Sequence, residues 1–290
     1  MKQIVVLSGK GGTGKTTVTA SLAHLASSEL SVVLADADVD AANLGLVLDP
    51  VKQETHDFVG GKLALIDEQA CIACGTCAEV CRYDAIIPGD VYSVDPLACE
   101  GCASCMYQCP VEAIRMEEQQ AGLWFRSDTR FGPLFHAHLF AGQENSGKLV
   151  TMVKQQGRLL ALDTNAAMLL VDGPPGIGCP VISASAGADM ALLVVEPTVS
   201  GVHDLERVLA TTEHFGVPAM VVVNKADLNL ANTEQIAAFC EERGVPMVGR
   251  LPYDEVVTEA MVAGQPVTAV GDNPVAQALH QMWAQIKETL

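Results

Sequence analysis

Basic residues are scarce in this chain of 290 residues. It has 17 lysines and arginines against 35 aspartates and glutamates, so its formal net charge is −18 and its pI is about 4.6. Nonspecific binding to nucleic acid and docking on anionic lipid both need a basic surface. We therefore expect no nucleic-acid partner and no electrostatic attachment to membranes.

The sequence also lacks the marks of a membrane-spanning, secreted or low-complexity chain. No apolar run is long enough to cross a bilayer, and no repeat has the length typical of solenoids. The chain starts directly with an expected strand rather than with a signal peptide. Apolar residues make up 49% of the chain, which is enough for a large core. We expect a cytoplasmic protein without a stable membrane anchor.

The first 25 residues predict a strand, a glycine-rich turn and a helix. Residues 4–7 are apolar, residues 16–25 are amphipathic, and the turn between them matches the phosphate-binding motif G-x-x-x-x-G-K-[ST]. In such a loop, backbone N–H groups surround phosphate oxygens, the lysine reaches the β- and γ-phosphates, and the hydroxyl ligates Mg²⁺. The residues expected at the nucleotide are Gly9, Lys10, Gly11, Gly12, Thr13, Gly14, Lys15, Thr16 and Thr17.

Residues 10–16 read K-G-G-T-G-K-T and so carry a second lysine, Lys10. This segment resembles the K-G-G-x-G-K-[ST] signature of the deviant Walker A ATPases, the family of MinD, ParA, the nitrogenase iron protein and the Mrp-type iron–sulfur carriers. The resemblance implies an ATPase that dimerises around ATP, as a homodimer or as a heterodimer with a related ATPase. It also implies that Lys10 reaches the nucleotide of the partner.

The resemblance assigns roles to two aspartates at strand ends. Asp38 matches the aspartate that handles the attacking water or the water shell of the metal, and Asp172 matches the Walker B carboxylate that holds Mg²⁺ through water. A turn or helix-capping role is the alternative for Asp36 and Asp40, and we favour it for Asp40. The expected catalytic residues are Lys10, Lys15, Asp38 and Asp172, and the expected Mg²⁺ residues are Thr16, Asp38 and Asp172.

Three further residues are expected near the base of the nucleotide. Asn224 follows an apolar run at 221–223, and by the resemblance it hydrogen-bonds adenine. Asp227 lies in the same short segment. Pro252 belongs to residues 251–254, which match the segment that flanks adenine in relatives. The resemblance therefore implies ATP and Mg²⁺ as cofactors.

The order of the strand-like runs predicts the fold class. Short runs at 191–195, 219–223 and 247–251 are separated by helical stretches. This alternation is typical of an α/β fold with a doubly wound, mostly parallel sheet that is covered on both faces. A last helix is expected after Asn273-Pro274, and we expect it to pack on the core rather than on a membrane.

Eight of the ten cysteines lie between Cys71 and Cys109. They repeat the spacing C-x2-C-x2-C-x3-C, typical of bacterial ferredoxins with two [4Fe–4S] clusters, in which the fourth cysteine of each run ligates the other cluster. Two zinc sites are the alternative. Arg82 replaces the usual proline of the first run and is expected to raise a cluster potential. The expected ligands are Cys71, Cys74, Cys77 and Cys109 for the first cluster and Cys81, Cys99, Cys102 and Cys105 for the second.

The cysteine-rich region interrupts the alternation of strands and helices. The whole chain thus resembles MinD-superfamily P-loop ATPases with an inserted two-cluster ferredoxin domain, including the stretches 129–133 and 144–148. Residues 71–118 hold eight acidic and two basic residues, so we expect a redox partner or acceptor protein to dock on this module. The expected domains are 60–119 for a small α+β ferredoxin-like insert, and 1–59 with 120–290 for a discontinuous MinD-like ATPase.

Four remaining cysteine and histidine residues receive no firm role. Cys179 lies where the nitrogenase iron protein has a cluster ligand, but the second cysteine of that protein has no counterpart here. A buried small residue is therefore favoured over a transient ligand or an interface thiol. Cys240 is expected in the core. His136 and His138 alternate with apolar residues, and no metal site is assigned to them.

Three functions are compatible with these features. The first is an ATPase whose nucleotide cycle gates electron transfer through two clusters, and we favour it. The second is an iron–sulfur carrier or assembly scaffold of the Mrp type, but the C-x-x-C that such carriers have near the C-terminus is missing after Cys109. The third is a positioning ATPase like MinD or ParA, against which the acidic charge and the lack of a basic last helix count.

Overall fold

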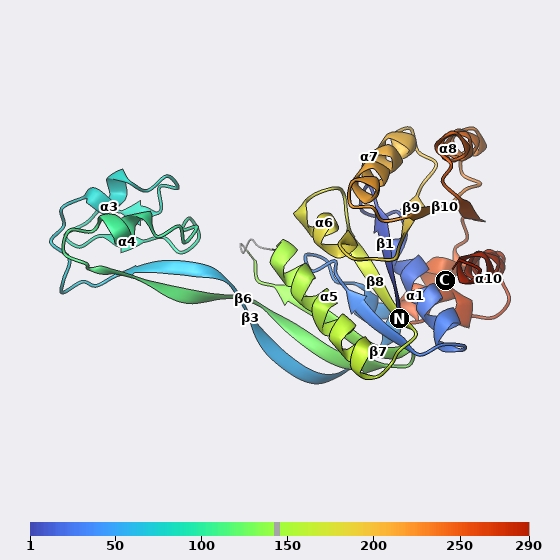
Figure 1. Ribbon diagram of the computed structural model, residues 1–290, viewed down its shortest axis with the longest axis horizontal. Helices are drawn as coiled ribbons and strands as arrows, with labels where there is room; N and C mark the ends of the chain where they lie inside the picture. The colour runs from blue at the N-terminus through green and yellow to red at the C-terminus, as the bar shows by residue number, and fades with distance from the viewer. Residues whose placement is uncertain (142–145, 290) are drawn as a thin grey trace. The chain divides into compact units, whose positions relative to one another are not determined.

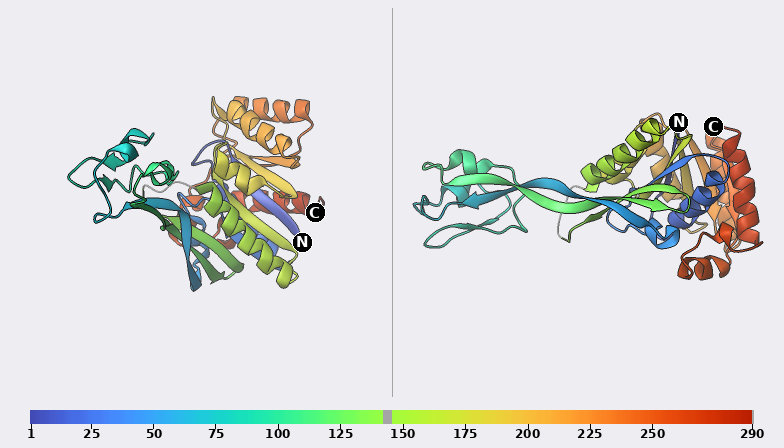
Figure 2. Two further views of the ribbon diagram at one scale, coloured as in Figure 1. Left: turned by 60° about the vertical axis from the view of Figure 1, so that its left-hand side comes forward. Right: turned by 90° about the horizontal axis from the view of Figure 1, so that it is seen from below.

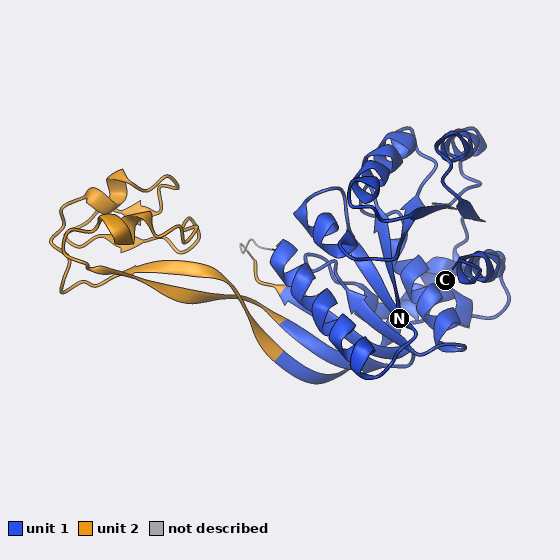
Figure 3. Cartoon of the chain, viewed as in Figure 1, with its two compact units in different colours: residues 1–55, 124–138, 146–290 blue, residues 56–123, 139–145 orange. Residues whose placement is uncertain are grey.

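The chain forms two compact units in the computed structural model, which describes residues 1–141 and 146–289 (Figure 3). Glu144 and Asn145 of the expected stretch 144–148, and Leu290 of the expected last helix, lie outside the described residues. The domain bounds expected from the sequence stay a prediction. Unit 1 consists of Met1–Thr55, Trp124–His138 and Ser146–Leu290, and unit 2 of His56–Leu123 and Leu139–Asn145.

A nine-stranded sheet runs in the order β11-β10-β9-β1-β8-β2-β7-β6-β3. The neighbours from β11 to β7 pair in parallel, which confirms the predicted α/β class with a mostly parallel sheet. The strands β3 and β6 form one edge and continue along the chain into unit 2. The strands are β1 (Lys2–Ser8), β2 (Val32–Asp36), β3 (Val51–Ile66), β6 (Ile114–Thr129), β7 (Gly132–Leu139), β8 (Met168–Pro175), β9 (Met190–Val195), β10 (Ala219–Asn224) and β11 (Met247–Leu251).

Helices cover both faces of the sheet in unit 1 (Figure 1). On one face, α1 (Lys15–Ser27) and α10 (Pro274–Lys287) lie side by side in Figures 1 and 2. On the other face, α5 (Ser146–Asp163) packs on α6 (Cys179–Ser185), and α7 (Gly201–His214) packs on β9. The other helical segments of unit 1 are α2 (Leu44–Leu48), α8 (Leu230–Arg243), α9 (Val256–Val262) and the 3-10 turn η1 (Val267–Ala269).

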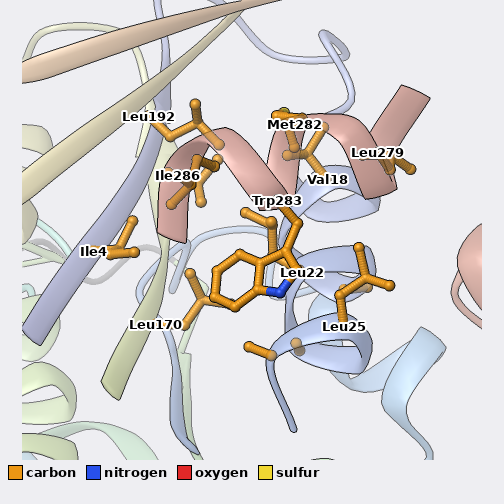
Figure 4. Packing of buried hydrophobic residues seen from close by; sticks show 14 of the residues in the cluster. Ile4, Val18, Leu22, Leu25, Leu170, Leu192, Leu279, Met282, Trp283 and Ile286 are labelled. Carbon is orange, nitrogen blue, oxygen red and sulfur yellow. The ribbon is translucent and has the colours of Figure 1, made fainter. Parts of the chain in front are cut away.

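The last helix packs on the core of unit 1, as predicted. The side chain of Asn273 accepts a hydrogen bond from Ala276 N at 2.8 Å, and Pro274 occupies the first turn, so both expected start signals are used. Leu279, Trp283 and Ile286 are buried against α1 and the sheet (Figure 4). In residues 1–141 and 146–289 no helix combines the length and the apolar character that a bilayer crossing needs.

Unit 2 is built from short elements between the ends of β3 and β6. It contains the helices α3 (Thr76–Glu79) and α4 (Ser104–Gln108), and β4 (Ile86–Ile87) pairs with β5 (Ser93–Val94) in antiparallel fashion. A small core of this unit includes Ala64, Ile86 and Ile114 together with several of the cysteines. Cysteines thus share this small core with apolar side chains, and Ile66, Val94 and Met116 pack against it.

The two halves of unit 2 share several backbone hydrogen bonds at matching positions. Asp67 N donates to Ala113 O, and Asp95 N donates to Ala85 O, both at 2.8 Å. The amides of the first cysteine in each run donate to the carbonyl oxygens of these same aspartates, at 3.0 Å and 3.1 Å. Two helix-capping positions, Gly75 and Ala103, share a left-handed backbone. The duplicated cysteine spacing therefore corresponds to a duplicated local structure.

Candidate functional site

The phosphate loop lies between β1 and α1, where the sequence predicts it. Gly14 has a φ of 93°, and a Cβ atom there would collide with Asn224 Nδ2. The same Nδ2 donates to Thr13 O at 2.8 Å. Asn224, at the carboxyl end of β10, thus fixes the conformation of the phosphate loop. The sequence did not predict this contact. Its contact with adenine stays a prediction.

The expected magnesium residues Thr16 and Asp172 are brought together at the end of β8. Thr16 Oγ1 donates to Asp172 Oδ2, and Thr19 Oγ1 donates to Asp172 Oδ1, each at 2.8 Å. Asp36 of β2 is the register partner of Asp172, and burial raises the pKa of both carboxyls. A hydroxyl and a buried carboxylate are oxygen donors of the kind that Mg²⁺ prefers, and Mg²⁺ keeps most of its remaining ligands as water and phosphate.

Asp38 lies on the same side of the cleft and faces the loop lysine. Lys15 Nζ is 3.9 Å from Asp38 Oδ2. Burial raises the pKa of Asp38 to about 6, and the nearby Lys15 opposes that rise. Asp36 accepts backbone N–H bonds from Asp38 at 3.2 Å and from Leu44 at 3.0 Å, so it holds the turn that presents Asp38. Asp40 is exposed at the rim of the cleft.

Lys10 is held within its own chain. Its Nζ donates to Thr198 Oγ1 at 3.0 Å and lies 3.7 Å from Glu196 Oε2. Lys225 Nζ donates to the other oxygen of Glu196 at 2.6 Å. Ser8 Oγ donates to the carbonyl of Lys10 at 2.7 Å, so both ends of this lysine are fixed.

A cleft of about 710 Å³ opens beside these groups. This volume suits a small-molecule ligand, because such sites measure roughly 300–1,000 Å³. Asp227 does not line the cleft but accepts the amide of Tyr253 at 2.7 Å, which fixes the segment after β11. The lining includes the loop residues Gly11, Gly12, Gly14, Lys15, Thr16 and Thr17, and also Asp38, Asn224, Pro252, Tyr253, Val257 and Met261.

Unit 2 contains two small cavities, each lined by one of the expected cysteine sets. Each fourth cysteine lies beside the first three cysteines of the other run. The remaining lining residues are mostly apolar. The first cavity is lined by Cys71, Cys74, Cys77 and Cys109, and the second by Cys81, Cys99, Cys102 and Cys105.

Hydrogen bonds reach several of these sulfurs in matched pairs. Ala85 N donates to Cys81 Sγ at 3.4 Å and Ala113 N to Cys109 Sγ at 3.3 Å. Cys74 Sγ is hydrogen-bonded to Thr76 Oγ1, and Cys102 Sγ to Ser104 Oγ, both at 3.4 Å. These hydroxyls are the main reason that the pKa values of Cys74 and Cys102 are lowered, and Arg82 adds a smaller effect at Cys102. Burial raises the pKa values of Cys77 and Cys105.

The sulfurs are not arranged around a single ion. Within the described residues, no three His, Cys, Asp or Glu side chains form a group that could hold one metal ion. Zinc needs its ligands around one centre. A [4Fe–4S] cluster is held by four thiolates distributed over a larger group, so the cysteines need not converge on one point. Four cysteines line each cavity, which is the number of thiolates that such a cluster takes.

The other singled-out thiols and histidines are not among the lining residues of the cleft or of the two small cavities, although Pro180, next to Cys179, lines the cleft. Cys179 is exposed as the first residue of α6, so the expectation of a buried residue is wrong; Val181 and Ala184 provide the buried face of that helix instead. Cys240 is in the core as predicted, and burial raises its pKa to about 11. His136 Nε2 is 2.9 Å from the Oγ atom of a buried serine, and burial lowers its pKa to about 4.

Several residues of the two sites were not identified from the sequence. Thr19 sits one helical turn after Lys15, which was a usable signal for a second hydroxyl on Asp172. Glu196 and Thr198 follow β9 directly, and the carboxyl ends of parallel strands meet at one edge of the sheet. Thr76 and Ser104 occupy the same position in the two cysteine runs, so their equivalence was visible.

Comparison with known proteins agrees with the fold and with the cleft. The CobQ/CobB/MinD/ParA nucleotide binding domain matches residues 4–267. An uncharacterized protein of Methanocaldococcus jannaschii is 33% identical over 99% of this chain and 96% of its own length. The septum site-determining protein MinD of Synechocystis is 28% identical over 91% of this chain and 80% of its own.

A solved structure shows the same fold. The septum site-determining protein MinD of Pyrococcus horikoshii, complexed with Mg-ADP, superposes with a TM-score of 0.61. It is 20% identical in sequence, and the match covers 98% of this chain and 95% of that one. With a domain match over most of its length and a relative 33% identical across it, this chain is a member of the CobQ/CobB/MinD/ParA family of nucleotide-binding P-loop proteins.

Proposed function

We propose that the chain is an ATPase that binds ATP with Mg²⁺ in the cleft of unit 1. The observation that carries this proposal is the hydrogen bond from Thr16 to Asp172, which joins the phosphate loop to the carboxylate at the end of β8. Thr16 would ligate a bound Mg²⁺ ion directly and Asp172 would hold it through water, and the ion would compensate the negative charge of the phosphates. The Mg-ADP in the structure of the Pyrococcus protein supports the same choice of cofactors.

Each remaining group around the cleft has a role in this reaction. The loop amides and Lys15 bind the phosphate oxygens and compensate their charge. Asp38, beside Lys15, orients the attacking water. Thr19 donates to the second oxygen of Asp172 and so fixes the direction of the carboxylate. Asn224, Asp227 and Pro252 belong to the side that receives the base.

The active form is a dimer, with a second copy of the chain or with a related ATPase. In this dimer, Lys10 reaches across the interface to the γ-phosphate of the nucleotide bound to the partner. It is 34% exposed in the single chain and is bound to Thr198 and Glu196. Dimerisation on ATP exchanges these contacts for the phosphate, which carries more negative charge than Glu196 alone.

Unit 2 holds two [4Fe–4S] clusters in this proposal. Its support is the pair of cavities lined by four cysteines each, together with the apolar lining and the hydrogen bonds to the sulfurs. Hydrogen-bond donors near thiolates stabilise clusters in ferredoxins. The clusters supply one-electron transfer, and the nucleotide cycle of unit 1 gates it. An acidic surface on this unit favours a redox partner with a basic face.

A second candidate function is positioning, and the comparisons favour it over electron transfer. Two of the relatives above are named for determining the septum site, and none of the three for electron transfer. ATP-dependent filaments or recruitment to vesicles would support this function. Transfer of clusters to an apo-protein would instead support an iron–sulfur carrier of the Mrp type.

Two measurements on the full chain test the proposal. Phosphate release with Mg-ATP should be measurable in the wild type and lost in Asp172→Asn, with Lys2→Ala, an exposed lysine of β1, as the control. Protein matured under anaerobic conditions should contain about eight irons and eight sulfides per chain, from two four-iron clusters. Two zinc ions without sulfide would overturn the cluster assignment and leave the ATPase assignment standing.

A further inference from the structure

We propose that Thr76 and Ser104 set the reduction potentials of the two clusters separately, each hydroxyl acting on one cysteine of its own site. The inference rests on the proposed cluster function and goes beyond it by naming the residues that tune each site. Thr76 Oγ1 is 3.4 Å from Cys74 Sγ, and Ser104 Oγ is 3.4 Å from Cys102 Sγ.

In the free thiol form Cys102 Sγ donates to Ser104 Oγ, and between Cys74 and Thr76 either atom can be the donor. Both contacts involve a side chain and so differ in kind from the backbone bonds at the other sulfurs. Cys81 and Cys109 each receive a backbone N–H, which no substitution of a side chain removes. Among the hydrogen bonds recorded for the described residues, only these two join a side-chain hydroxyl to a cluster-site cysteine. These are therefore the hydrogen bonds to each site that a side-chain substitution can remove.

Their position on the outermost cysteines matters for the potential. Cys74 and Cys102 are exposed, whereas Cys77 and Cys105 at the centre of each run are buried. Solvent access and hydrogen bonds to the sulfurs both set the potential of a cluster. A hydroxyl that is hydrogen-bonded to the exposed sulfur acts on the part of the site that solvent reaches most. Its partial positive charge there affects the reduction potential of the cluster.

The sign of the effect follows from the protonation state of the ligand. A cysteine that ligates iron is a thiolate and has no proton to give, so the hydroxyl is the donor. Reduction adds negative charge to the cluster and its sulfurs, and a donor stabilises the more negative state more strongly. Loss of the hydroxyl should therefore lower the potential of the cluster to which its cysteine belongs.

The duplicated structure separates the two effects. Cys74 belongs to the cavity that includes Cys109, and Cys102 to the cavity that includes Cys81. Thr76 begins α3 and Ser104 begins α4, so each hydroxyl belongs to one site. Each substitution is thus the matched control for the other.

The test uses the full chain with both clusters, titrated by potential and followed by the EPR signals of the reduced clusters. Thr76→Val should lower one of the two midpoint potentials, Ser104→Ala should lower the other, and the double variant should lower both. Thr76→Ser and Ser104→Thr keep a hydroxyl and should restore wild-type values. Iron and sulfide content, measured in every variant, shows that both sites are loaded.

Three results would overturn the inference. They are unchanged potentials in both single variants, an equal shift of both midpoints in each single variant, or a shift in Thr76→Val that Thr76→Ser does not reverse. If Thr76→Val binds less iron, Thr76→Ala replaces it with the same expected result. A wild type without iron and sulfide contradicts the proposed function instead, so the two failures are distinguishable.

Discussion

Lys10 Nζ donates a hydrogen bond to Thr198 Oγ1 at 3.0 Å, within a single chain. Thr198 follows β9, 188 positions further along the sequence. Glu196, at 3.7 Å, places a negative charge beside the same amine. The lysine that the family resemblance assigns to a partner's nucleotide is thus held on its own subunit when no partner is present.

Lys10→Ala should abolish ATP hydrolysis while leaving ATP binding nearly unchanged. Lys15 and the loop amides remain to bind the phosphates, whereas the charge that we propose to cross the dimer interface is lost. A cation supplied to the transferring phosphoryl group is worth roughly 10³-fold or more in rate. Single-turnover phosphate release and ATP affinity should be measured side by side. Full turnover in Lys10→Ala would rule out the role across the interface, and Lys2→Ala tests whether loss of any exposed lysine matters.

Asp38→Asn should stabilise the nucleotide-free protein above pH 6. Burial raises the pKa of Asp38 to about 6, above the 3.8 of an unperturbed aspartate, so the folded state binds the proton more tightly than the unfolded state. The carboxyl is protonated in both states only well below pH 3.8, and its ionised form opposes folding increasingly as the pH rises from 3.8 to about 6. The gain in free energy of unfolding, on the order of 1 kcal/mol after solvent screening, should appear at pH 8 and be much smaller at pH 4.

Urea unfolding of Asp38→Asn and of the wild type at these two pH values checks the sign. A stability difference that is constant between pH 4 and pH 8 would show that ionisation of Asp38 is not its cause. The same variant should hydrolyse ATP slowly, because the amide no longer orients the attacking water as the carboxylate does.

The sequence predicted the parts of the structure that local patterns specify. The phosphate loop, Asp172 at the end of an apolar strand and the start of α10 at Asn273 all depend on residues close together in the chain. The contacts of Lys10 with Glu196 and Thr198 depend instead on which strands are neighbours in the sheet. Spacing alone does not determine that order.

The long strands β3 and β6 show a second limit of prediction from local sequence patterns. Residues 51–57 of β3 are all exposed, so the strand shows no alternation of apolar and polar side chains. That alternation is the main sequence signal for a half-buried strand. β3 runs without a break from Val51 to Ile66, across residue 60 where the insert is expected to begin, and the expected domain bounds stay a prediction.

Leu279→Ala should lower the free energy of unfolding of the chain by about 2–5 kcal/mol. Leu279 is fully buried in α10, between α1 and the sheet (Figure 4), and the substitution leaves a cavity that neighbouring side chains fill only in part. Gln281→Ala, at an exposed position of the same helix, is the control and should change stability by less than about 0.5 kcal/mol. Equal effects of the two substitutions would contradict the packing of α10 on the core.

ATP binding and cluster reduction should be thermodynamically coupled if the first proposed function holds. The route is continuous along the chain. β2 ends at Asp36, the register partner of Asp172, and pairs with β7, and β7 follows β6 after the turn at Arg130. The guanidinium of Arg130 donates to Val47 O at 3.1 Å and to Gly264 O at 2.9 Å, and these carbonyls belong to the segments around α2 and α9 that border the nucleotide cleft. β6 itself begins at Ile114, in the core shared with the cysteines.

Thermodynamic linkage requires any coupling between ATP binding and cluster reduction to be reciprocal. If ATP favours one redox state, that redox state must change ATP affinity by the same factor. ATP affinity should be measured for oxidised and for reduced protein, and the cluster potentials with and without a non-hydrolysable ATP analogue. We expect a difference of roughly 5-fold or more in affinity, the range typical of coupled sites, and a matching shift in potential. Arg130→Lys keeps the charge but loses the forked donor, so it should weaken the coupling while the clusters remain loaded. Equal ATP affinities in both redox states would mean that unit 2 only docks a partner, and the positioning function that the relatives are named for would then be the better account of the ATPase.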